Sequence, residues 1–371
     1  MDLNSVGVVF GGPSPEHDVS VLTGLAALRE LAASGGHGRV TGIYWSTLSE
    51  FFEVAADLEA GAFSGGVPNS AAPLRLVAQS GGGFIAKGSL GREKRIDLDA
   101  VINCCHGGPG EDGTLAAVLD LAGISYAGPG VAGSAIGMDK LAFGCLVDSA
   151  GMPVLDRKLL TVSSEIEFGG PYIVKPRFGG SSIGIDTVSD LTTAKARLSA
   201  NQHLKAGAVI EPYRPDLFDL NIAMRTWPEL SLSAIERPIR RTANAEILDY
   251  RDKYVGGEGM VTAPRELPAK IDPGLGKQIV DAATLISELC KVRGVARLDF
   301  LSDGDEIFVN ELNTIPGSLS KHLWVEPDVK FGVLLSDLLA EAVQRPAAIY
   351  TSAGADGTVL STAGSIASKL G

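Results

Sequence analysis

The sequence lacks most of the features that mark zinc-thiolate, membrane and nucleic-acid-binding proteins. Its 371 residues include four cysteines, and no two of them have the CxxC spacing of a structural zinc site. The apolar stretch nearest to a membrane span, residues 121–138, is interrupted by several glycines and a proline. Acidic residues (44) outnumber basic ones (32), and the net charge of −12 argues against a broad surface for nucleic-acid phosphates.

The first ten residues, MDLNSVGVVF, also lack the charged-then-apolar pattern of a secretory signal. Together these absences predict a cytoplasmic soluble protein with neither a membrane nor a nucleic acid as partner. A chain of this length has room for two to three domains.

Glycine, in contrast, is abundant, with 46 residues that often follow short apolar runs. Such runs predict buried strands over residues 6–10, 40–44 and 99–105. Helical spacing predicts helices over residues 20–32 and 114–122. Residues 60–92, rich in Gly, Ser, Ala and Pro, predict a loop region with a weak hairpin. Strand, glycine turn and helix in alternation favour a doubly wound parallel sheet.

The sequence of the rest of the chain predicts an α+β arrangement. Helices are predicted over residues 138–150, 275–289 and 331–343, and strands over 172–176, 208–212, 296–301 and 306–312. We expect four parts: an α/β substrate domain, a central domain, a C-terminal domain and a mobile tail, at residues 1–133, 134–219, 220–346 and 347–371.

Two glycine-rich segments follow predicted strands of the first domain. In GGPSPEHDVS, backbone N–H groups can face an anion, and Glu16 could hold a substrate ammonium group, although such loops are often only turns. In HGGPGEDGT, which begins at His106, glycines and acids stand at the carboxyl end of a strand, where open α/β sheets bind ligands. Taken alone, Asp112 and Thr114 in this segment are better explained as helix caps than as catalytic residues.

A third segment, KPRFGGSSIG, has the chemistry of a loop that covers phosphates without the Walker spacing. Lys175, on a predicted strand, supplies a point charge, and the Gly-Gly-Ser-Ser N–H groups that follow, including that of Ser182, can close over a phosphate. An ordinary surface loop is the alternative.

The fourth candidate is a pair of strands, ARLDF and NELNT, near the carboxyl end. Alternation places Arg297 and Asp299 on one face of the first strand, and Glu311 and Asn313 on one face of the second. If the strands pair, Asp299, Glu311 and Asn313 bring three oxygen-bearing groups together. Oxygen ligands of this kind suit Mg²⁺ beside nucleotide phosphates, and a solvated sheet edge is the alternative.

These segments, in this order, resemble the D-alanine–D-alanine ligases of the ATP-grasp superfamily. The resemblance runs from about residue 6 to residue 339 and is carried by GGPSPEHDVS, HGGPGEDGTLAAVLDLAGISYAGPGVAGSAIGMDK, YIVKPRFGGSSIGI, LDYRDKY, ARLDF and NELNTIPG. It implies an ATP-grasp fold and an ATP-dependent carboxylate–amine ligase that forms a dipeptide through an acyl phosphate. It also implies ATP and Mg²⁺ (with Mn²⁺ as an alternative) as cofactors and a homodimer.

The resemblance implies a role for each matching residue. For ATP, the matching residues are Lys140, Lys175, Ser182, Glu211, Asp219 and Lys253. For the amino acids and the reacting groups, they are Glu16, His106, Ser181, Tyr254, Arg297, Gly317 and His322. For the metal, they are Asp299, Glu311 and Asn313.

His322 stands where the family carries a serine for the carboxylate of the second substrate, and Asp219 stands where a glutamate is usual. These departures leave two alternatives beside dipeptide formation from D-alanine. One is a biosynthetic ATP-grasp ligase with a different amine as acceptor. The other is an inactive nucleotide-binding homologue, although the full set of lysines, acids and Arg297 argues against it.

Overall fold

The computed structural model describes residues 3–88, 91–239 and 264–366. Its first part is built on an eight-stranded sheet in the order β6-β5-β4-β3-β2-β1-β7-β8. Four of these strands are parallel: β1 (Ser5–Gly11), β2 (Arg39–Trp45), β7 (Ala100–Asn103) and β8 (Tyr126–Ala127). The other four form an antiparallel meander: β3 (Phe51–Val54), β4 (Ala72–Val77), β5 (Gly83–Lys87) and β6 (Glu93–Arg95).

Helices cover both faces of the parallel strands, which confirms the doubly wound arrangement. Val8 and Phe10 on β1 share a core with α1 (His17–Ser34) and α9 (Phe331–Gln344). Val9, which alternation turns to the other face, packs in a core with α3 (Thr114–Ala122). The prediction of a parallel sheet thus holds for four of the eight strands. In the predicted loop region 60–92, the hairpin is present as β4 and β5, beside the short helix η1 (Ala60–Phe63).

A second, four-stranded antiparallel sheet follows in the chain, in the order β11-β10-β12-β9. Its strands are β9 (Lys158–Leu160), β10 (Tyr172–Pro176), β11 (Asp186–Val188) and β12 (Ala208–Pro212). The bounds of β10 and β12 are those expected from the sequence. The associated helices are α4 (Val131–Met138), α5 (Lys140–Ser149), α6 (Leu191–Ala200) and η3 (Gln202–Leu204).

The helix predicted over residues 138–150 is present as α5, but it begins two residues later than expected, because the chain breaks at Asp139. Asp139 is extended (φ −87°, ψ 97°) and ends α4. Its carboxylate accepts hydrogen bonds from the N–H groups of Leu141 (3.0 Å) and Ala142 (3.2 Å), as an N-cap does. A new helix, α5, therefore begins at Lys140.

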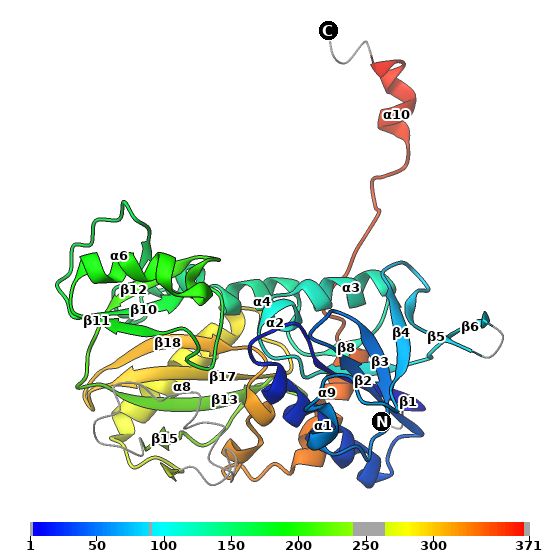
Figure 1. Cartoon of the computed structure of the whole chain (residues 1–371), viewed down its shortest axis with the longest axis horizontal. Coiled ribbons are helices and arrows are strands. Elements are labelled where there is room, and N and C mark those ends of the chain that lie inside the picture. Colours follow the sequence, from blue (N-terminus) through cyan, green and yellow to red (C-terminus); the bar gives the residue numbers. More distant parts are fainter. Residues whose placement is uncertain (1–2, 89–90, 240–263, 367–371) are drawn as a thin grey trace.

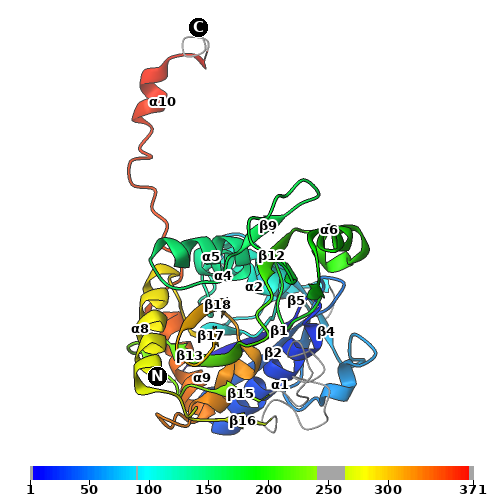
Figure 2. The ribbon, with the colours of Figure 1, turned by 90° about the vertical axis from the view of Figure 1, so that its left-hand side faces the viewer.

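The third sheet has the order β14-β13-β17-β18. Its strands are β13 (Phe218–Arg225), β14 (Ser231–Leu232), β17 (Val295–Ser302) and β18 (Ile307–Asn313). The amphipathic helix α8 (Pro273–Leu289) buries its apolar face against this sheet. The antiparallel pairing of β17 with β18 confirms the strand pair expected from the sequence. Figures 1 and 2 show this sheet lying below the second one, with the first domain beside both.

Several short elements complete the described chain. The strands β15 (Arg237–Pro238) and β16 (Arg265–Glu266) form a separate two-stranded sheet. The short helices α2 (Gly108–Glu111) and η4 (Gly317–Leu323) follow β7 and β18. Beyond α9 the chain leaves the body of the molecule, and its last described helix is α10 (Thr358–Ala363), which buries no residue (Figure 1). None of the described helices is long and apolar enough to cross a membrane. The four-part division of the chain stays a prediction.

Candidate active site

Two cavities meet at the acidic face of β17 and β18. One encloses about 1270 Å³ and the other about 940 Å³, their open mouths included. Both are lined by Lys140, Gly179, Gly180, Asp219, Asp299 and Glu311. The first extends towards the first domain, and the second extends between the second and third sheets. Two ligands bound in these cavities would therefore meet beside the same acids and lysine.

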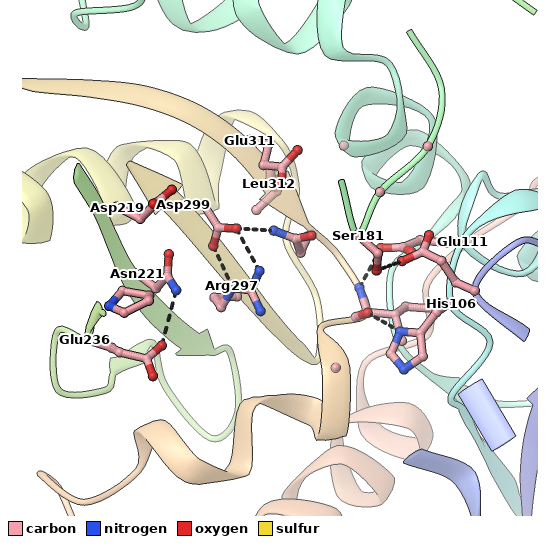
Figure 3. A pocket seen from close by; sticks show the side chains of 18 of the residues that line it. His106, Glu111, Ser181, Asp219, Asn221, Glu236, Arg297, Asp299, Glu311 and Leu312 are labelled. Atoms are coloured by element: carbon pink, nitrogen blue, oxygen red, sulfur yellow. Dashed lines mark hydrogen bonds and ion pairs between the residues drawn. The ribbon is translucent and has the colours of Figure 1, made fainter. Parts of the chain in front are cut away.

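The predicted acid and amide cluster lies at this meeting point. Asp299 is directly opposite Glu311, and Arg297 is directly opposite Asn313, so the four side chains share one face of the sheet. The Arg297 guanidinium forms two bonds to Asp299, at 2.6 and 2.7 Å, and the Asn313 Nδ2 atom donates to Asp299 at 3.0 Å (Figure 3). The convergence expected from the sequence is present, whereas its role as a metal site stays a prediction.

A β-bulge at Asn310 makes this arrangement possible. Phe300 pairs with Val309 and Asp299 pairs with Glu311, so Asn310 is the extra residue on β18. Val309 and Leu312 are both buried although three positions separate them, which strict alternation does not allow. The bulge thus keeps both in the core while Glu311 and Asn313 face the cavity.

The two predicted phosphate-binding lysines border the cavities from different elements. Lys140, at the start of α5, donates to the carbonyl oxygen of Gly179, and its Nζ lies 3.5 Å from an oxygen of Glu311. Lys175, on β10, lies 2.7 Å from Glu211 and 3.2 Å from the side-chain oxygen of Asn310. Both lysines are buried, and acidic or amide oxygens hold them in place.

Glu211 is fully buried on β12 and forms two ion pairs. Its oxygens lie 2.6 Å from Arg157 Nε and 2.7 Å from Lys175 Nζ. Burial opposes ionisation, but the two cations outweigh it and hold the pKa of Glu211 below its usual value. Arg157 also donates to the carbonyl oxygens of Lys140 (2.6 Å) and Asn310 (2.9 Å). Arg157 therefore connects the second sheet to β18.

The glycine-serine loop reaches across to the first domain. At its base, Arg177 donates to Asp139 at 2.8 Å. At its tip, Ser181 has a left-handed backbone (φ 53°), and its hydroxyl donates to Glu16. Ser182, also left-handed, lines the second cavity. The loop thus brings Glu16 and Ser181 together, and both line the first cavity.

Glu111, which our sequence analysis did not single out, lies beside Glu16. Its oxygens accept hydrogen bonds from the N–H groups of Gly107 (2.9 Å) and Ile315 (3.0 Å) and from the hydroxyl of Thr314 (3.1 Å). Burial, with a further contribution from the Glu16 carboxylate, raises the pKa of Glu111 to about 7. Glu111 therefore joins the first domain to the segment after β18.

His106 lines the same cavity, but partners occupy both of its ring nitrogens. Nδ1 lies 2.6 Å from the carbonyl oxygen of Ile315, and Nε2 lies 2.8 Å from the hydroxyl of Thr23. Burial lowers the pKa of His106 to about 4, so the ring is neutral near pH 7. These two hydrogen bonds orient the His106 ring and hold the backbone at Ile315 beside the first cavity.

The remaining predicted residues occupy the same cavity or lie outside the described chain. Gly317, at the start of η4, lines the first cavity together with Arg297, and Asp219 on β13 lines both cavities. His322 lines the first cavity at the end where Asn221 and Glu236 lie. Lys253 and Tyr254 fall outside the described residues.

The donor set at β17 and β18 fits a hard divalent cation. Asp299 and Glu311 offer carboxylate oxygens and Asn313 offers an amide oxygen, the donor types that Mg²⁺ prefers. In the described ranges, no three His, Cys, Asp or Glu side chains are grouped so as to hold a metal ion, and the set on β17 and β18 combines two carboxylates with one amide.

Comparison with known proteins agrees with this geometry. Residues 5–129 match the family model described as D-ala D-ala ligase N-terminus, and residues 131–344 match D-ala D-ala ligase C-terminus. The chain belongs to the D-alanine–D-alanine ligase family. Family members are ATP-dependent ligases that act on small molecules, and this protein is an enzyme of that kind.

Individual members of the D-alanine–D-alanine ligase family are similar over most of their length. The D-alanine--D-alanine ligase of Campylobacter lari is 32% identical over 322 residues, covering 86% of this chain and 88% of the relative. The D-alanine--D-alanine ligase of Mycolicibacterium vanbaalenii is 31% identical over 363 residues, covering 92% of this chain and 97% of the relative.

Solved D-alanine–D-alanine ligases share the ATP-grasp fold with this chain. The enzyme from Helicobacter pylori has a TM-score of 0.70 at 23% identity and covers 90% of this chain and 98% of its own. D-alanyl-alanine synthetase A from Vibrio cholerae has a TM-score of 0.74 at 20% identity and covers 92% and 99%.

Several residues of this ligase site carry no sequence signal that we could interpret. Arg157, Glu236 and Arg265 stand in segments without a glycine-rich or acidic motif. Glu111 stands inside HGGPGEDGT, and a closer reading of that segment could have marked it as a second acid near Glu16. Pairing across long sequence separations brings these residues to the site, and such pairing is invisible in local patterns.

Proposed function

We propose that the protein joins two D-alanine molecules in an ATP-dependent reaction that releases ADP and phosphate. The observation that carries this proposal is the meeting of two cavities at Asp299, Glu311 and Lys140. One cavity has the size and lining for a nucleotide, and the other has room for two small amino acids. Family membership supplies the reaction class, and the names of the relatives supply the substrate.

ATP lies in the second cavity in this proposal. Its phosphates face Lys140, Lys175 and the N–H groups of the loop that includes Ser182. Its nucleoside lies near Glu211 and Asp219, and Lys253 contributes from the segment outside the described chain. Asp299, Glu311 and Asn313 would hold Mg²⁺ (or Mn²⁺), which would neutralise charge on the phosphates.

The first D-alanine lies at the opposite end of the first cavity. Glu16, held by Ser181 and assisted by Tyr254, binds its ammonium group. A carboxylate oxygen of this D-alanine attacks the γ-phosphorus of ATP, the bond from phosphorus to the ADP oxygen breaks, and an acyl phosphate forms. The lysines stabilise the charge that moves onto the departing ADP.

The second D-alanine then supplies the amine. Its nitrogen attacks the acyl carbon, and Arg297 and the Gly317 N–H group stabilise the oxyanion that develops. The carbon–oxygen bond to phosphate breaks, the nitrogen loses a proton, and the dipeptide remains. His106 orients the chain before Gly317, and His322 lies beside the acceptor.

We further propose that the enzyme works as a homodimer in the cytoplasm, where ATP is available. Its four cysteines, all free and three of them buried, suit a reducing compartment. A different acceptor amine and an inactive homologue are not favoured. The Campylobacter lari and Mycolicibacterium vanbaalenii relatives carry the same name, D-alanine--D-alanine ligase, and the predicted lysines and acids of the described chain line the cavities.

The test is phosphate release from ATP with single D- and L-amino acids, followed by mass spectrometry of the product. We expect release with D-alanine alone and a product of the mass of D-alanyl-D-alanine. Release with L-alanine but not D-alanine, or release only with another amine, would contradict the assignment.

A further inference from the structure

A buried arginine stands behind the wall of the second cavity. Arg157, in the segment between α5 and β9, has a side chain that is 7% exposed and lines neither of the two cavities. Its Nε atom lies 2.6 Å from an oxygen of Glu211, and its Nη atoms donate to the carbonyl oxygens of Lys140 (2.6 Å) and Asn310 (2.9 Å). Glu211 is the charged one of these three acceptors, so the charge of Arg157 acts mainly on Glu211.

The fold leaves a fitted space for this guanidinium. Gly144 on α5 faces it, and a Cβ atom at Gly144 would lie 3.2 Å from Nη1 of Arg157, closer than side chains normally pack. The three acceptors belong to three elements, since Glu211 lies on β12, Lys140 begins α5 and Asn310 lies on β18. All three acceptor residues line the second cavity. Arg157 therefore holds together the wall of the second cavity from outside.

Glu211 divides its two carboxylate oxygens between two cations. One oxygen lies 2.6 Å from Arg157 and the other lies 2.7 Å from Lys175. Burial raises the pKa of Glu211, but the charges of Arg157 and Lys175 lower it by more, so the carboxylate is ionised. Two cations and one anion give this group a net charge of +1. Without Arg157, the charge of Glu211 would cancel that of Lys175.

This balance matters because the second cavity is not basic overall. Its described lining includes three basic residues, Lys140, Lys175 and Arg214, and four acidic ones, of which Glu211 is one. Such a lining does not by itself attract the phosphates of a nucleotide, which carry several negative charges. A buried charge is screened little by salt and acts at longer range than an exposed one. The charge of Arg157 therefore reaches ligands that Arg157 does not touch.

We propose that Arg157 gives the second cavity its affinity for nucleotide phosphates, because it pairs with Glu211 and so leaves the charge of Lys175 free to act on the ligand. This inference rests on the proposed position of ATP and deepens it, since it names a residue that controls the binding of phosphates from behind the cavity wall. Arg157 is a positioning residue that acts through Glu211 and Lys175.

Binding measurements with ADP and adenosine test the proposal. Adenosine shares the nucleoside and lacks the phosphates, so the Kd of adenosine divided by the Kd of ADP measures what the phosphates contribute. Isothermal titration calorimetry of the full chain at one Mg²⁺ concentration gives both constants. We expect this ratio to fall about tenfold in Arg157→Gln, because a unit charge about 10 Å from a phosphate has an effect of roughly that size at an effective dielectric constant of about 20. The Kd of adenosine itself should stay nearly unchanged.

Two further variants separate charge from shape. Arg157→Lys keeps the charge and loses the planar guanidinium, so its ratio should stay within about threefold of the wild-type value. The double variant Arg157→Gln with Glu211→Gln loses one charge of each sign and keeps Lys175. Its ratio should therefore return close to the wild-type value, even if its affinity for the nucleoside changes.

The matched control is Arg293→Gln. Arg293 is 6% exposed and, like Arg157, donates to three different residues, in this case to the carbonyl oxygens of Tyr126 (2.6 Å), Gly128 (2.9 Å) and Arg345 (2.9 Å). It lies outside the lining of both cavities. Losing Arg293 should lower the free energy of unfolding in urea and leave the ratio at the wild-type value.

Each result is decisive. An equal loss of ADP and adenosine affinity in Arg157→Gln, or an unchanged ratio, would overturn the inference. A ratio in Arg157→Lys as low as in Arg157→Gln would also overturn it, because shape and not charge would then be responsible. A fall in the ratio in Arg293→Gln would mean that loss of stability alone lowers it, with the same consequence.

The remaining variants decide the outcome if Arg157→Gln does not fold. A low ratio in Arg157→Lys or in the double variant then overturns the inference, and wild-type ratios in both support it. Because ADP binds without any dipeptide being formed, failure of the proposed function can be told apart. A wild type that binds ADP more tightly than adenosine but forms no D-alanyl-D-alanine would contradict the proposed function alone.

Discussion

Single residues at this site have environments that determine their chemistry, and Glu311 is the clearest case. Its carboxylate lies opposite Asp299 and 3.5 Å from Lys140, where both cavities meet. We expect Glu311→Ala to lower kcat by more than about a hundredfold. Replacing a residue that only hydrogen-bonds to a metal ligand typically lowers metal affinity or activity about 10–100-fold, and removing a ligand itself should lower activity further.

The measurement is the rate of phosphate release as Mg²⁺ is varied. Glu306→Ala is the matched control, since Glu306 is exposed in the turn between the same two strands. Near-normal turnover of Glu311→Ala at ordinary Mg²⁺ concentrations would remove Glu311 from the metal site.

Glu111 links the pH dependence of stability to the junction between the domains. The folded protein keeps its proton up to about pH 7, whereas an unshifted glutamate releases it near pH 4.5. Between these values the folded state binds more protons than the unfolded state, so this group's contribution to stability is lost as pH rises. The glutamine side chain of Glu111→Gln cannot ionise, so the stability of this variant does not fall with rising pH through this position.

We therefore expect the destabilisation caused by Glu111→Gln to be largest near pH 5 and to shrink by up to about 3 kcal/mol by pH 8. Urea unfolding of both proteins at several pH values measures it. If the difference in unfolding free energy between the wild type and Glu111→Gln stayed constant, or grew with pH, Glu111 would already be ionised at pH 5 in the folded protein.

Among the elements, the bulged strand β18 has the most direct effect on the site. A strand that slips by one residue turns its side chains to the opposite face. Deleting Asn310 should therefore either bury Glu311 and Asn313 or expose Leu312, and it also removes a partner of Lys175 and Arg157.

We expect the deletion to abolish turnover and to lower stability by several kcal/mol, in the range of a buried leucine lost from a core. Asn310→Ala serves as the comparison, because it keeps the bulge while removing the bond to Lys175. If the deletion variant kept its turnover, the bulge would have no part in placing the acids.

Across the whole molecule, sequence patterns predicted what depends on neighbouring residues. The bounds of α3, β10 and β12 follow from hydrophobic spacing and glycine punctuation, and the acids on β17 and β18 follow from alternation. The contact between Glu111 and Ile315 joins residues 204 positions apart, and Arg157 meets Glu211 from a different segment. No local pattern encodes such pairs, because they exist only after the domains pack.

The tail beyond α9 contributes least to this packing. The helix α10 has six residues, buries none of them and exposes Val359 and Leu360 by 73% and 80%. A helix this short has little stability of its own, and without packing the tail adds little to the folded state. Arg293, which binds the carbonyl oxygen of Arg345 at 2.9 Å, fixes the chain before the tail begins.

Removing residues 353–371 should therefore change the melting temperature by less than about 1 °C, since that shift corresponds to less than about 1 kcal/mol in a chain of this size. Turnover and the number of subunits, obtained as the molar mass from light scattering divided by the mass of one chain, should also equal those of the full chain. A smaller number of subunits would show instead that the exposed side chains of α10 pack against a second copy, and a large fall in turnover would place the tail at the active site.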